Sequence, residues 1–118
     1  MSGIHNAHAR LDMAVDALAT LSHSLKARLI YAAFHIINDM KAEDLPPGDL
    51  RSEYENVVAL LTRLPPQPPS DGGIQATIHA MTDADAEEAS RRIVALARKV
   101  AEETSRLNSK TAAASRFK

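Results

Sequence analysis

The sequence predicts an all-α protein, an antiparallel bundle of about four main helices plus one short helix. Apolar residues recur at spacings of three and four along most of the chain, the period of an amphipathic helix. No run alternates between polar and apolar residues for long enough to form a strand. The chain has 118 residues, 45% of them hydrophobic, and no cysteine, so its core has to hold by packing alone.

A first amphipathic helix is expected over about 4–21, where Ile4, Leu11, Val15 and Leu18 share one face. The central helix follows in the most apolar stretch, 18–40. Its apolar arc covers about half of the circumference, wider than the ~100° of a typical surface helix. We therefore expect this helix to be covered from more than one side.

The triplet Ser22-His23-Ser24 leaves two readings of residues 4–43 open. Ser22 or Ser24 is a suitable N-cap for a second helix, which would make a tight hairpin. A single helix running through to Glu43 is equally consistent, because no glycine or proline interrupts the stretch and the apolar stripe stays in phase.

The third helix follows the turn Pro46-Pro47-Gly48, which ends the central helix. Either Asp49 caps this helix or the two prolines form its first turn. Its apolar residues make a heptad seam, which we interpret as a candidate interface with a partner. The seam consists of Leu50, Tyr54, Val57, Leu61 and Leu64.

The last third of the chain begins with a Pro/Gly-rich connector at 65–73, which we interpret as a spacer across the bundle. A short helix is expected over 74–81, and Thr82 is the predicted N-cap of a long final helix. From Ser105 on the apolar period is lost. We therefore predict one helical domain over 1–104 and a basic, disordered tail over 105–118.

The formal net charge is −1, but the charge is unevenly placed. The tail after Glu103 holds four basic residues and no acid, so the preceding body sums to −5. An acidic body without tryptophan argues against nucleic-acid binding except through the basic tail. No apolar run reaches the ~20 residues of a membrane span, and the first residues resemble no signal peptide, so we expect a cytoplasmic protein.

Metal and cofactor chemistry is not expected. The chain has five histidines, but His35 and Asp39, four residues apart, supply only two ligands where a zinc site uses three or four. Neither a glycine-rich phosphate loop nor a serine–histidine–aspartate signature can be placed.

The tetrad His23-Ser24-Leu25-Lys26 resembles the phosphoacceptor helix of histidine phosphotransfer domains. The resemblance implies His23 as the phosphoacceptor, with Lys26 as the cation that neutralises the incoming phosphoryl group. Those domains place glycine after the lysine, whereas this chain has Ala27.

The pair Arg28 and His35 resembles the Arg-x(4–6)-His spacing of HEPN-type helical ribonucleases. The resemblance implies an active site shared across a dimer interface, here bordered by Tyr31 and Asp39. In that family the pair belongs to a late helix, whereas here it lies in the N-terminal half.

A third interpretation, which is the leading one, requires no catalytic site. The wide apolar arc and the heptad seam offer more apolar surface than a thin bundle buries, and such surface is commonly covered by a second copy or a partner. We therefore expect a bacterial-type, non-enzymatic protein that acts through protein–protein contacts, as a subunit, adaptor or regulator, and that forms a homodimer. The catalytic candidates of the two alternatives are His23, Arg28, His35 and Asp39.

Overall fold

The computed structural model describes residues 3–64 and 73–116, with side chains as far as 110, and confirms the all-α prediction. Four main helices are α1 (Gly3–Thr20), α2 (Leu25–Asp39), α3 (Asp49–Leu61) and α5 (Asp83–Arg116). A short helix, α4, spans Gly73–Ala80, and a 3-10 turn, η1, spans Ala42–Asp44. Residues 65–72 of the predicted connector lie outside the described residues, and its last residue, Gly73, begins α4.

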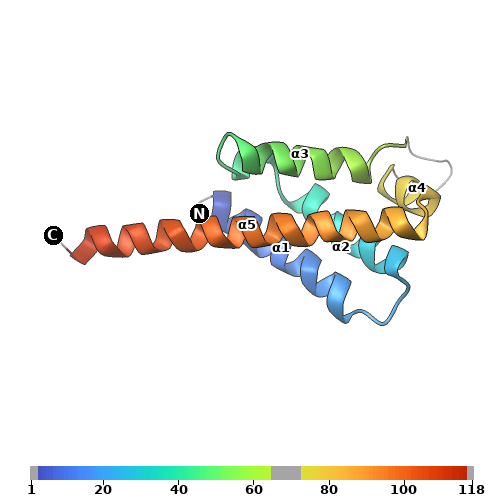
Figure 1. Ribbon diagram of the computed structural model, residues 1–118, viewed down its shortest axis with the longest axis horizontal. Coiled ribbons are helices and arrows are strands. Elements are labelled where there is room, and N and C mark those ends of the chain that lie inside the picture. Colours follow the sequence, from blue (N-terminus) through green and yellow to red (C-terminus); the bar gives the residue numbers. More distant parts are fainter. Residues whose placement is uncertain (1–2, 65–72, 117–118) are drawn as a thin grey trace.

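Helix α5 is the longest helix, and the α1–α2 hairpin and α3 pack against it (Figure 1). In the view of Figure 1, α3 runs along one side of α5, the α1–α2 hairpin crosses behind α5 with its loop on the other side, and α4 lies near the start of α5. The side chains that meet between these helices are apolar and fully buried. They include Leu11, Leu29, Ile36, Leu61, Ile78, Ile93, Leu96 and Val100.

The two readings of residues 4–43 are resolved in favour of a hairpin. Helix α1 ends at Thr20, and α2 begins at Leu25 with Ser24 as its N-cap. The Ser24 hydroxyl accepts a hydrogen bond from the Ala27 amide at 3.3 Å. From α2, Arg28 Nη1 donates to the Leu18 carbonyl at 2.7 Å and so satisfies an acceptor in the last turn of α1.

Helix α2 ends at Asp39, four residues before the expected Glu43, because other elements take up its last carbonyls. Asn6 Nδ2 of α1 donates to the Asp39 carbonyl at 3.1 Å. The Tyr54 hydroxyl of α3 lies 3.1 Å from the Met40 carbonyl. Met40 itself is extended, with φ −138° and ψ 164°, which stops the helix.

Two further boundaries are corrected in the second half of the chain. Helix α3 ends at Leu61 rather than Leu64, and the Leu64 amide instead donates to Thr77 Oγ1 of α4 at 2.9 Å. The last helix does not end near Ser105 but continues as α5 to Arg116. Residues 105–116 contain no glycine or proline, and extending an existing helix costs little.

The predicted cap of α5 is confirmed. The Thr82 hydroxyl accepts a hydrogen bond from the Asp85 amide at 3.1 Å. Asp83 and Asp85 lie in the first turn, where negative charge suits the helix dipole. At the start of α3, Gly48 rather than Asp49 is the N-cap, and its φ of +118° is a conformation that glycine adopts without strain.

Candidate functional site

One side of α2 carries apolar side chains that the other helices enclose only in part, since Ile30 and Phe34 pack against the core but stay half-buried. It lies opposite the buried side of α2, which holds Leu29, Ala32, Ala33 and Ile36. All its residues are half-buried or exposed, and none is charged. We call this surface the outer face of α2; it consists of Ala27, Ile30, Tyr31, Phe34 and Asn38.

A hollow of about 330 Å³ lies beside this face, between α1 and α2. Within the described part of the chain, Met13 and Tyr31 are the large hydrophobic residues left exposed, at 43% and 51%. Both line this one hollow, together with His35 and the carboxylate of Asp16. Methionine and tyrosine are enriched at protein interfaces, because they bury a large area at little conformational cost.

His23 and His35 make only loose contacts with their neighbours. The ring of His23 stacks on that of Tyr31, with centroids 6.1 Å apart and planes 23° apart. His35 Nδ1 is buried and lies 3.7 Å from Asp39 Oδ2, but forms no hydrogen bond in the described structure. His35 and Asp39 therefore make a loose pair at the edge of the outer face.

Arg28 and His35, the pair that resembles a ribonuclease motif, have different surroundings. The Arg28 guanidinium is bound to the Leu18 carbonyl at the end of α1, where it closes the hairpin. His35 lines the hollow, two turns and about 10 Å further along α2. The bond to Leu18 gives Arg28 a structural role, although its Nε is buried without a hydrogen-bond partner in the described structure.

His23, the residue that resembles a phosphoacceptor, lies in the hairpin loop rather than on a helix. The nearby cation that the resemblance implies, Lys26, is directed elsewhere. Its Nζ donates to the His79 carbonyl at the end of α4, at 3.3 Å. Among the described residues His23 is exposed and keeps its ring nitrogens free, whereas Lys26 is directed towards α4 instead of towards His23.

The heptad seam of α3 faces the chain's own core. Tyr54, Val57 and Leu61 are at most 6% exposed, whereas Leu50 and Leu64 are half-buried. Burial raises the pKa of the Tyr54 hydroxyl, and the negative charges of Asp44 and Glu43 add to this effect. Because three seam residues are already enclosed, we place the candidate contact surface on α2 instead.

Paired histidines and carboxylates occur twice, at separate places. His8 lies 3.5 Å from Asp12 on α1, and His35 pairs with Asp39 on α2. Among the described residues no group of three or more histidine, aspartate or glutamate side chains comes close enough to hold a metal ion.

Sequence reasoning identified the wide apolar arc of the central helix but missed Met13. This residue lies out of phase with the buried stripe of α1, which holds Leu11, Ala14 and Leu18. The signal that could have identified Met13 is a large apolar side chain on the polar side of a predicted helix.

Comparison with known proteins finds no matching protein-family model, no matching curated protein and no matching solved structure. Over residues 3–64 and 73–116, none of the helices combines the length and apolarity needed to cross a membrane.

Proposed function

We propose that this chain is a small non-enzymatic helical protein that acts through protein–protein contacts, as a subunit, adaptor or regulator. The contact surface is the outer face of α2 with the adjoining hollow. One observation carries the proposal: the exposed Met13 and Tyr31 meet at one hollow, beside a helix face without charge. Soluble monomers place charged residues on such a face, and contiguous apolar patches mark contact sites.

The occupant that fits this face best is a second copy of the chain. The face is centred on Tyr31 and Phe34, near the middle of α2. A twofold axis through that point brings each of these rings against its counterpart, as in an isologous interface. The outer face itself carries no charge, so no like charges meet at a twofold axis through it; the contact surface does include one carboxylate, Asp16, which lines the adjoining hollow.

Burial of Tyr31 alone gives a useful magnitude. The side chain is 51% exposed, so a dimer would remove about 100 Å² of aromatic surface from water in each copy. At about 25 cal/mol per Å², this contributes about 2.5 kcal/mol per copy before the cost of association. Phe34, Ile30 and Met13 add to this contribution where they are still accessible.

Cysteine cross-linking tests the proposal directly, because the chain has no cysteine of its own. Tyr31→Cys should form a disulfide-linked dimer under mild oxidation, since residues near a twofold axis between packed helices come within disulfide range. The control is Ala59→Cys, which lies exposed on α3 and should stay monomeric on a denaturing gel. Equal cross-linking of the two variants would contradict the proposed face.

A further inference from the structure

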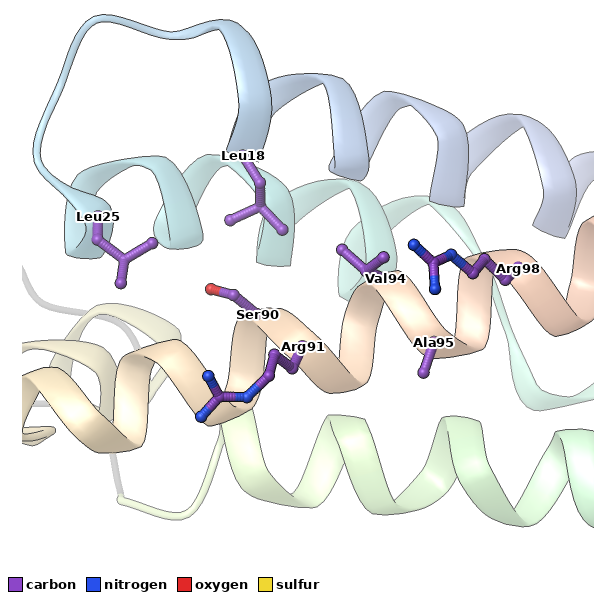
Figure 2. Close-up of a pocket in the computed structure, with 7 residues that line it drawn as sticks. All are labelled: Leu18, Leu25, Ser90, Arg91, Val94, Ala95 and Arg98. Carbon is purple, nitrogen blue, oxygen red and sulfur yellow. The ribbon is translucent and has the colours of Figure 1, made fainter.

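A second, separate groove runs between the α1–α2 hairpin and α5 (Figure 2). Its hollow is about 440 Å³ and opens to solvent. Leu18 and Leu25 approach it from the hairpin, and Ser90 and Val94 lie across from them on α5. This groove shares no lining residue with the hollow beside the outer face of α2.

The groove continues along α5 into a neighbouring hollow of about 270 Å³. The two hollows share Val94 and Arg98, and the second adds Val15, Ala97 and Ala101 as apolar lining. From Ser90 to Ala101 the trough follows α5 for about 16 Å. This length matches about three turns of a helix laid alongside.

The larger hollow is bordered by cations. Arg91 and Arg98 line it, seven residues apart on α5, and no carboxylate does. Arg91 is held 3.4 Å from Glu88, whereas Arg98 has no ion pair or hydrogen bond within the described part of the chain. The carboxylate of the second hollow, Asp12, lies 3.5 Å from His8.

We propose that this groove binds an amphipathic, acidic helix of a protein partner. Leu18, Leu25 and Val94 receive its apolar side chains, as in helix-in-groove recognition. Two carboxylates seven residues apart on that helix meet Arg91 and Arg98, which are about 10 Å apart along α5. An open trough of three turns suits a helix better than a small molecule, which pockets usually enclose.

The test uses a defined probe, a fluorescein-labelled helical peptide of about 15 residues. It carries leucines at spacings of three and four on one face and two glutamates seven residues apart beside them. Fluorescence anisotropy against the full chain should give saturable binding. Arg98→Glu should weaken this binding about tenfold, because a favourable charge contact becomes a repulsive one.

Lys110→Glu is the matched control, since it makes the same charge change on an exposed residue of α5 that lines neither hollow of the groove. It should weaken binding less than about twofold, as a change at a distant exposed charge does. Tyr31 lies on the outer face of α2 and does not line the groove, so Tyr31→Glu should leave peptide binding unchanged. Peptide binding and the proposed dimer can therefore fail separately.

Three outcomes would overturn the inference. They are no saturable binding to the wild type, equal weakening by Arg98→Glu and Lys110→Glu, and equal binding of a peptide whose leucines are replaced by glutamine. The last two would mean attraction by charge alone, without a groove. Circular dichroism of each variant confirms that the helices are intact before binding is compared.

Discussion

Tyr54 joins α3 to the end of α2, and replacing it with phenylalanine removes that link alone. Its hydroxyl lies 3.1 Å from the Met40 carbonyl and 3.4 Å from the Ile36 carbonyl, and the side chain is buried. Tyr54→Phe keeps the ring but leaves buried carbonyls without a donor. We expect the free energy of unfolding to fall by about 1–2 kcal/mol.

The same substitution should change how stability depends on pH. Burial raises the pKa of Tyr54 above its ordinary value of 10.0, with added contributions from Asp44 and Glu43. Below pH 10.0, the pKa of an unburied tyrosine, the hydroxyl is protonated in both the folded and the unfolded chain. As the pH rises past it, the unfolded chain loses the proton first, so the free energy of unfolding falls. Phenylalanine cannot titrate. The difference in the free energy of unfolding between the wild type and Tyr54→Phe should therefore become smaller at alkaline pH.

Urea denaturation followed by far-UV circular dichroism, at several pH values from about 7 to 11, measures both effects. Tyr31→Phe is the matched control, because it keeps the aromatic ring and removes a hydroxyl that forms no hydrogen bond among the described residues, so stability should change by less than about 0.5 kcal/mol. If Tyr54→Phe is as stable as the wild type and equally sensitive to alkali, the hydroxyl does not hold α2 and α3 together.

Truncation after Leu107 should lower the melting temperature by only about 2 °C, because residues 108–110 are exposed and α5 projects there beyond the other helices (Figure 1); a much larger drop in a thermal scan would show that the end of α5 supports the bundle. His35→Ala should change the free energy of unfolding by about 0.5 kcal/mol or less. We expect no cleavage of RNA by the wild type, and cleavage that is lost in His35→Ala but kept in His23→Gln would establish a nuclease instead. Incubation with a cognate kinase should place no acid-labile phosphate on His23, and label that disappears in His23→Gln would contradict this expectation.

The fold class and most helices followed from apolar spacing, whereas the boundaries depended on contacts that spacing does not encode. The end of α2 at Asp39 rests on Asn6 and Tyr54, which come from other helices. The choice of a hairpin over one long helix rests on Ser24 and on Arg28, which reaches back to α1. Such side chain to backbone contacts form only once the helices have packed.

The sequence predicted that the candidate site is an apolar helix surface, but it did not predict which helix carries that surface. A heptad period shows that one side of a helix is apolar, but it does not say what covers that side. For α3 the cover is the core of the chain itself, so Val57 and Leu61 are buried. For α2 the apolar arc is too wide for its neighbours to enclose, which leaves Phe34 half-buried on the outer face, beside the exposed Tyr31 that the sequence placed with the polar residues.

The molar mass in solution tests the central claim most directly, namely that the outer face of α2 is a contact surface between copies. Light scattering at micromolar concentration should give about twice the 12.8 kDa mass of one chain for the wild type. Tyr31→Glu places a charge beside its own counterpart at the twofold axis and should return the protein to a monomer, whereas the control Ala59→Glu should stay dimeric. A wild type that measures as a monomer, or a Tyr31→Glu variant that remains a dimer, would contradict this account.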